Sequence, residues 1–321
     1  MALRVPRGPL LVLLTVAFAL LALACSTPPP SDDSSEGTVV SQEPIESGET
    51  IDSPSPDPSD PSDPIPSDGI YPSPESAGTP KVEGGAPRDT GRFLVEYRPP
   101  STPAYAEVQK VLQNSQVLEH VAAGLNAELA LPRDLTLSAE QCGMVNAFYD
   151  PRVKRLILCY ELVNHFAEMY QHIEGQSEDE FVSGVFSAMV LVLYHEIGHA
   201  LVDVFDIKTP GRPEDVVDQL AVFMLLKKGE EQGARMAMRG ARYFALSARE
   251  RGSAEIAFWD EHSTDETRFF NIYCWIYGSD KDKYSSFVDS GILPPQRAAR
   301  CTDEYTQLSE GWNRLLQPHM R

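Results

Sequence analysis

The chain of 321 residues carries 27 lysines and arginines against 47 aspartates and glutamates, a formal net charge of −20. Its length allows one large or two small globular domains, and a hydrophobic content of 42% is enough for a folded core. Because phosphate binding needs a basic surface, the acidity argues against nucleic acid as the main partner; a metal ion or a cationic peptide remains compatible with it.

The first 24 residues predict an export signal. Two arginines precede an apolar run of about 15 residues, which is too short for a comfortable bilayer span. The run ends in Leu-Ala-Leu-Ala-Cys at residues 21–25, which resembles a bacterial lipobox, with Ala22 where that motif usually has leucine. The resemblance implies a lipid on Cys25 and a membrane-anchored lipoprotein on the extracytoplasmic side of a bacterial cell envelope. Plain secretion and an uncut anchor are the alternatives.

Residues 25–92 predict a tether that begins at the lipidated cysteine. Residues 26–92 contain 14 acidic and three basic residues, together with 14 of the 26 prolines of the chain. Such a segment buries too little apolar surface to offset the entropy of ordering, and proline and like charges keep it extended. We therefore expect a disordered, acidic Pro/Ser-rich linker that holds the next domain away from a membrane. An acidic recognition segment is the alternative.

The remaining residues, 93–321, predict one α+β domain with a small N-terminal β-sheet beside a helical body. Short strands are expected at 93–97 and 135–138, with one or two helices between them at 105–125. Helices are also expected at 177–205, where Ser-Glu-Asp-Glu forms a capping box, and at 213–228, 231–251 and about 265–275. The sequence shows no repeat at the periods of solenoids or propellers.

Residues 142–160 predict a β-hairpin that turns at Asp150-Pro151. Cys142 and Cys159 lie nearly equidistant from this turn, so we expect them to face each other across the two strands. Exported cysteines usually pair, and the predicted disulfides are Cys142–Cys159 and Cys274–Cys301, with free thiols as the alternative. No two cysteines have the close spacing of a thiolate zinc site.

The sequence His195-Glu196-Ile197-Gly198-His199 lies in the middle of the first long helix. Residues four apart share one helical face, so both imidazoles can reach one metal ion, while Glu196 beside them can take a proton from metal-bound water. The alternative, two histidines buried as ordinary core groups, would require several further polar partners.

A zinc site of this kind needs a third protein ligand and a water molecule. Glu214 and Asp218 lie four apart at the start of the next helix, so Glu214 can bind the metal while Asp218 holds the outer nitrogen of a ligand histidine. Asp215 is the alternative ligand, and an acidic first turn that answers the helix dipole is the alternative explanation of this segment. The third histidine of metzincins is absent, because Val202 and Phe205 stand where that motif has glycine and histidine.

These two motifs resemble the gluzincin arrangement of thermolysin-like peptidases, in which the first glutamate is the base, the second is a ligand and the aspartate supports a ligand histidine. Residues 194–200 with 213–219 are closer still to a bacterial family of unknown function whose members are described only as candidate metallopeptidases. Residues 146–151, 159–161 and 262–274 share that resemblance, which spans most of residues 93–301. It implies a zincin-like fold, one Zn²⁺ and a peptide or protein substrate. The gap between His199 and Glu214 is shorter than in thermolysin, which leaves the choice of ligand open.

Peptide hydrolysis also needs a donor for the oxyanion that forms when water attacks a carbonyl. His262, Arg268 and Tyr273 are the candidates, and their alternative roles are a solvated loop residue, an ion-pair partner and a core residue. The hairpin strand that ends at Tyr160 could offer its edge to an extended peptide.

The leading hypothesis is a zinc-dependent endopeptidase tethered at an extracytoplasmic membrane surface. The second is a non-catalytic metal-binding or protein-binding lipoprotein, and the third is a scaffold lipoprotein without a metal. A pure binder has no need of Glu196, since this residue is not expected to be a ligand. Its presence therefore favours the enzyme.

Overall fold

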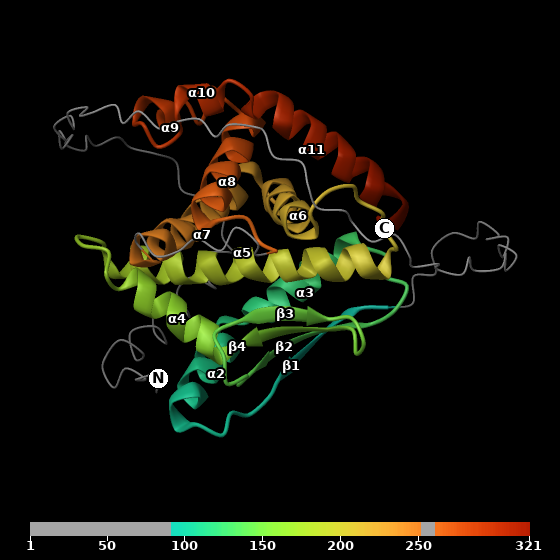
Figure 1. Ribbon diagram of the computed structural model, residues 1–321. Helices are drawn as coiled ribbons and strands as arrows, with labels where there is room; N and C mark the ends of the chain where they lie inside the picture. Colours follow the sequence, from blue (N-terminus) through green and yellow to red (C-terminus); the bar gives the residue numbers. More distant parts are fainter. Residues whose placement is uncertain (1–90, 252–260) are drawn as a thin grey trace, which may run out of the picture. The chain divides into compact units, whose positions relative to one another are not determined.

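The computed structural model describes residues 91–251 and 261–321 (Figure 1). The predictions of an export signal, of a lipid on Cys25 and of the acidic linker therefore lie almost wholly outside the described residues. In chain order the elements are β1 (Phe93–Tyr97), α2 (Pro103–Ser115), α3 (Val117–Glu128), β2 (Leu135–Glu140), β3 (Ala147–Asp150), β4 (Arg155–Cys159), α4 (Tyr160–Tyr170), α5 (Glu178–Val204), α6 (Pro213–Lys227), α7 (Glu230–Arg251), α8 (Asp265–Ser279), α9 (Ser286–Asp289), α10 (Pro295–Ala298), α11 (Cys301–Leu316) and a final 3₁₀ turn (Gln317–His319). This is the predicted α+β architecture, a small sheet followed by a helical body.

The sheet is mixed and has the strand order β1-β2-β4-β3. β1, β2 and β4 are parallel, and β3 runs antiparallel to β4 at the edge. The suggestion that the strand ending at Tyr160 offers a free edge is wrong, because this strand is β4, which pairs with β2 on one side and β3 on the other. Within the described residues, the edge strands are β1 and β3.

One face of the sheet packs against helices at both of its edges. The row Tyr97, Ala139, Leu158 and Ala147 is in register across the four strands, so these side chains share a face, and Tyr149 follows on it. The Tyr97 hydroxyl donates to Glu119 of α3, and the Tyr149 hydroxyl donates to Asp203 of α5. The same face therefore contacts α3 beside β1 and α5 beside β3.

The predicted hairpin exists, but it is shorter than expected. Its pairing runs from Ala147 opposite Leu158 to Asp150 opposite Arg155, so Cys142 precedes the paired strand. Both predicted disulfides are present, Cys142–Cys159 and Cys274–Cys301. The first joins the loop after β2 to the last residue of β4, and the second joins α8 to the first residue of α11. The argument that Cys142 and Cys159 face each other across paired strands was therefore wrong, although the pairing is the one predicted.

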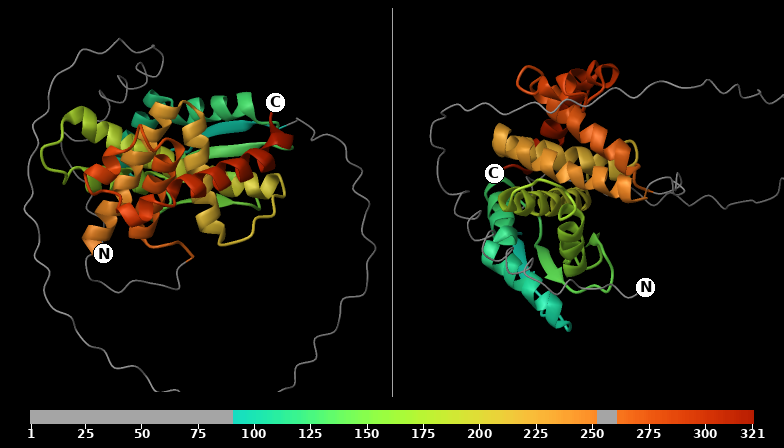
Figure 2. Two further views of the ribbon diagram at one scale, coloured as in Figure 1. Left: turned by 90° about the horizontal axis from the view of Figure 1, so that it is seen from above. Right: turned by 90° about the vertical axis from the view of Figure 1, so that its left-hand side faces the viewer.

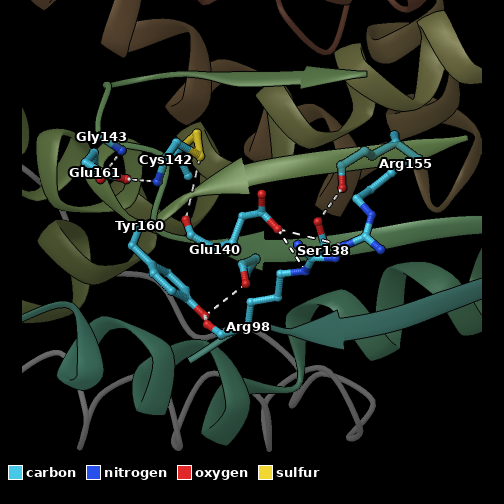
Figure 3. The surroundings of a disulfide bond; sticks show 11 residues. Arg98, Ser138, Glu140, Cys142, Gly143, Arg155, Tyr160 and Glu161 are labelled. Atoms are coloured by element: carbon cyan, nitrogen blue, oxygen red, sulfur yellow. Dashed lines mark hydrogen bonds and ion pairs between the residues drawn. A yellow bond between two sulfur atoms is a disulfide. The ribbon is translucent and has the colours of Figure 1, made fainter. Parts of the chain in front are cut away.

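The loop that leads into β3 is held at its start (Figure 3). The buried carboxylate of Glu161 accepts hydrogen bonds from the backbone N–H groups of Cys142, at 3.1 Å, and Gly143, at 2.7 Å. The Tyr160 hydroxyl lies 2.8 Å from the carbonyl oxygen of Arg98 and 2.9 Å from that of Ala139. Together with the disulfide, these contacts fix the position from which β3 begins.

Helix α5 is the central element of the described residues. The Ser177 hydroxyl accepts from the backbone of Glu180, whose carboxylate accepts from the backbone of Ser177, so the predicted capping box is formed. By length and composition α5 could span a bilayer, but 78% of its most apolar window is buried, as in the core helix of a folded domain. The sheet lies on one side of α5, and α6, α7 and α8 lie on the other (Figures 1 and 2).

Candidate metal centre

The centre is built where α5 and α6 touch. His195 and His199 lie one turn apart on α5, and α6 begins at Pro213 so that Glu214 falls in its first turn. A Cβ atom on Gly198 would lie only 2.9 Å from the Cβ atom of Val217 on α6. The glycine of the motif therefore permits the close helix contact that brings Glu214 to the histidines.

Three imidazoles converge on one carboxylate oxygen. Glu214 Oε2 lies 3.0 Å from His195 Nε2, 3.3 Å from His199 Nε2 and 3.1 Å from His262 Nε2. The ligand atoms of His195, Glu214 and His262 all lie within 4.8 Å of one another and could hold a metal ion. Three nitrogens and one carboxylate oxygen form a donor set that suits a borderline cation such as Zn²⁺.

A buried ion pair supports His195 from behind. Asp218 Oδ1 lies 2.7 Å from His195 Nδ1, and Arg268 donates to both carboxylate oxygens of Asp218, at 2.7 and 2.8 Å. The guanidinium also stacks on Phe244, with 4.2 Å from its carbon to the ring centroid. Because an ionised carboxylate only accepts, His195 Nδ1 carries a proton, and Nε2 is the nitrogen that faces Glu214 and would bind a metal.

The electrostatics of the cluster follow from these contacts. Burial alone would lower the pKa of His195, but hydrogen bonds to Asp218 and Glu214 outweigh it and raise this pKa to about 9. Burial would raise the pKa of Glu214 and of Asp218, yet the imidazoles around Glu214 and the Arg268 guanidinium beside Asp218 hold both well below their usual range. The two carboxylates are therefore charged at neutral pH.

Glu196 lies next to the cluster without joining it. Its side chain is buried yet lines the cleft, and within the described residues it makes no hydrogen bond. Burial raises its pKa, while the neighbouring imidazoles of His195 and His199 lower it. The carboxylate is thus close to the ligands and free of competing partners.

The loop that carries His262 is clamped by the start of α6. Arg212 donates to the carbonyl oxygen of Glu261 at 2.8 Å, and Ser263 donates to Asp215 at 2.6 Å. Asp215, the alternative third ligand, is therefore engaged with the loop, whereas Glu214 faces the histidines. This clamp holds the half-exposed His262 over Glu214.

The three candidate oxyanion donors do not lie together. His262 lies at the cluster and Arg268 lines the cleft, but both N–H groups of Arg268 that face the centre are engaged by Asp218. Tyr273 is not among the described residues that line the cleft; its ring packs against Phe269 and Phe287, with centroids 4.5 and 5.0 Å away. Of the three, His262 is the residue whose side chain lies at hydrogen-bonding distance from Glu214 in the described part of the chain.

The centre opens into a cleft of about 590 Å³. Its lining comes from β3 and the residues that precede it, from α4 to α8, and from the His262 loop. The lining includes Val145, Asn146, Phe148, Tyr149, Leu162, Val192, Asp203, Tyr243 and Phe244.

Sequence reasoning missed the contacts that join α5 to β3 at this cleft. Asp203 accepts a hydrogen bond from the Tyr149 hydroxyl and pairs with Lys154, both at 2.5 Å. Asp203 is four residues after His199, which is four after His195, so helical spacing alone could have placed it on the metal-binding face. Tyr149 belongs to the segment that carried the resemblance, where it had been given no role.

A family model described as "Putative metallopeptidase" matches residues 97–316, which is more than half of the chain and includes every residue of the centre. No curated protein and no solved structure matches. The chain therefore belongs to this metallopeptidase family.

Proposed function

We propose that the protein is a zinc-dependent endopeptidase with a zincin-like fold. The observation that carries the proposal is the convergence of three imidazole nitrogens on Glu214 Oε2, with the unpartnered carboxylate of Glu196 beside them. A site that only stored a metal would not need a buried carboxylate held free of hydrogen bonds, since such burial is costly.

The residues that would hold the ion are His195, His199 and Glu214. A catalytic zinc site combines three protein ligands with one open position, and two imidazoles with one carboxylate are such a set. When bound, the ion would polarise the scissile carbonyl and lower the pKa of a water molecule. The buried Asp218–Arg268 pair would hold the Nδ1 proton of His195 in place and so aim Nε2 at the ion, which displaces the Nε2 proton on binding.

Glu196 would act as the general base and then as the acid. Its pKa is raised by burial and lowered by the imidazoles, so the carboxylate can accept a proton from water and return it to the leaving amine. It reaches the cleft from the helix that carries the two histidines, which fixes its position relative to them.

We assign His262 to the substrate side. It lies on a loop, its side chain is 41% exposed, and its ring stacks at 5.9 Å on that of His195. A fourth protein ligand would close the position that water requires, so the imidazole suits a hydrogen bond to the carbonyl oxygen of the substrate better than a permanent place on the metal. Its clamped loop would supply the positioning.

An extended peptide would bind along β3. Cys159 N–H donates to the Asn146 carbonyl, so by the alternation of an antiparallel ladder the backbone groups of Ala147 and Tyr149 point away from β4. These groups can pair with a substrate strand, in the mode of β-strand addition. A protein substrate with an extended segment therefore fits this cleft.

A lipid on Cys25 would place this cleft at an extracytoplasmic membrane surface, at the end of the acidic linker. Supporting this are only the arginines, the short apolar run and the lipobox-like ending of residues 21–25. The Cys25→Ala variant should be released from the membrane fraction, and wild type should incorporate a labelled fatty acid. A wild-type chain that carries no label would refute the anchor.

The decisive experiment compares Glu196→Gln with Glu178→Gln, a matched change on the exposed first turn of α5. Hydrolysis of a mixed peptide library and metal content are measured together. Glu196→Gln should retain its metal while hydrolysis falls by about 10²–10⁴-fold, the usual loss of general acid–base catalysis. Glu178→Gln should match wild type. A metal-loaded wild type that cleaves nothing would favour the alternative of a metal-binding lipoprotein without turnover.

A further inference from the structure

A second cavity, of about 670 Å³, lies beside α7 and α8 and shares none of its lining with the metal cleft. Neighbouring residues of the same helices face different cavities. On α7, Tyr243 lines the cleft and Arg242 the second cavity; on α8, Arg268 lines the cleft and Phe269 the second cavity. Its volume is in the range of sites that bind small organic ligands.

Tyr273 offers a hydrogen-bond donor to this cavity. Tyr273 is 7% exposed and lines the cavity one helical turn after Phe269, yet its hydroxyl makes no hydrogen bond in the described part of the chain. Burial raises the pKa of Tyr273, so the phenol keeps its proton at neutral pH. The ring is buried while the hydroxyl is open to the cavity, so a ligand oxygen could accept its hydrogen bond.

The rim is cationic on an otherwise acidic chain. Arg242 and Arg249 are seven residues apart on α7, hence on one face, and the field of Arg242 lowers the pKa of Tyr273. Neither arginine has a hydrogen bond or ion pair among the described residues. The other described arginines of α7 with polar contacts lie outside this cavity: Arg235 pairs with Glu231, Arg239 donates to Ser183, and Arg251 pairs with Asp265.

The remaining lining distinguishes the kind of anion. Glu174 contributes a single carboxylate against the two guanidinium groups, so positive charge prevails. Leu246, Phe269 and Ile292 supply apolar surface, and Ile292 is 41% exposed. An inorganic anion would leave this apolar surface exposed to water, whereas a carboxylate attached to an apolar group would bury it.

We propose that this cavity binds a small carboxylate with an aromatic or branched apolar body. The carboxylate accepts from the guanidinium groups of Arg242 and Arg249 and from the Tyr273 hydroxyl, and the body rests on Phe269. Two sources share this chemistry, a free organic acid and the C-terminal residue of a peptide. The site is separate from the catalytic proposal, because its ligand does not touch the metal residues.

Isothermal titration of the full chain tests this with 3-phenylpropionate and N-acetylphenylalanine as probes, each against its neutral amide. Both acids should bind, and the amides should bind about tenfold more weakly. Tighter binding of N-acetylphenylalanine supports a peptide C-terminus, and tighter binding of 3-phenylpropionate supports a free acid. Equal binding of acids and amides, or no binding of either acid, overturns the proposal.

Variants locate the binding site. Arg242→Gln and Arg249→Gln, both exposed, should each weaken the acids by about tenfold, and Tyr273→Phe by about threefold. Arg235→Gln, on the same helix but outside the cavity, should have no effect. Acid binding that survives Arg242→Gln and disappears on chelation belongs to the metal cleft and refutes the second site.

Discussion

The Asp218–Arg268 pair should have two separable roles, in stability and in metal binding. Asp218 is 8% exposed and the Arg268 side chain 13%, so Asp218→Ala strands a buried guanidinium. Removing one partner of a buried pair costs about 3–5 kcal/mol in the free energy of unfolding. For a domain of this size each kcal/mol shifts the melting temperature by about 2–4 °C, so we expect a decrease of roughly 6–20 °C in metal-free protein.

The metal affinity of the same variant should fall for a different reason. Asp218 Oδ1 holds His195 Nδ1 at 2.7 Å, and loss of such a partner typically weakens metal binding by about 10–100-fold. The double variant Asp218→Ala/Arg268→Met removes the stranded charge as well. It should recover most of the lost melting temperature but none of the lost affinity, because the imidazole still lacks its partner.

Calorimetry of chelator-treated protein and competition with a chromophoric zinc chelator measure the two quantities. Asp215→Ala is the control, since Asp215 lies on the same helix and contacts Ser263 instead of His195. It should leave zinc affinity unchanged. The reasoning fails if Asp218→Ala melts within a degree of wild type, or if the double variant regains both stability and affinity.

Three further outcomes can be tested, two at the metal centre and one at a disulfide. The metal-free pKa of His195 is raised to about 9, so the ring is protonated at pH 7 and zinc must displace a proton. Zinc affinity should therefore rise by about tenfold per pH unit up to roughly pH 9. Calorimetric titrations in buffers of different ionisation enthalpy should detect the released proton. Flat affinity over that range would contradict it. His262→Ala should keep one zinc per chain by elemental analysis while peptide hydrolysis falls. His199→Ala should lose the zinc. If both variants lose the metal, His262 is a ligand. Replacing Cys142 and Cys159 with alanine should cost about 3 kcal/mol in urea unfolding, because that disulfide closes a loop over a sequence separation of 17, and an unchanged midpoint would refute this.

Local signals in the sequence predicted the local structure well. The capping box at Ser177 begins α5, the proline at 213 begins α6, and four-residue spacing places His195 and His199 on one face. These features depend on interactions within a few residues, which a single sequence displays directly. For the same reason Glu214 and Asp218 could be assigned to neighbouring turns before their partners were known.

The errors concern contacts between distant segments. The hairpin turn indicated that β3 and β4 pair but could not show that β2 pairs with the other side of β4, which removes the edge expected near Tyr160. Cys142 lies outside the hairpin because β3 contains only four residues. Arg268 and Tyr273, two of the alternative oxyanion donors, are five residues apart on α8, a turn of about 140°, so they face different sides of that helix.

The side chains of the metal centre differ in burial, so one side of the centre is rigid and the other is open to a substrate. His195 and Asp218 are both under 10% exposed and lie where α5 and α6 are most tightly packed, whereas the side chains of His199 and His262 are 26% and 41% exposed. The closely packed side fixes the direction of one imidazole, and close packing resists small displacements. The open side faces the cleft, where the loop clamped by Asp215 and the edge strand tied to Asp203 could adjust to a peptide. Changes on the packed side should therefore alter metal affinity first, and changes on the open side at residues that are not ligands, such as His262, should alter turnover while the metal stays bound.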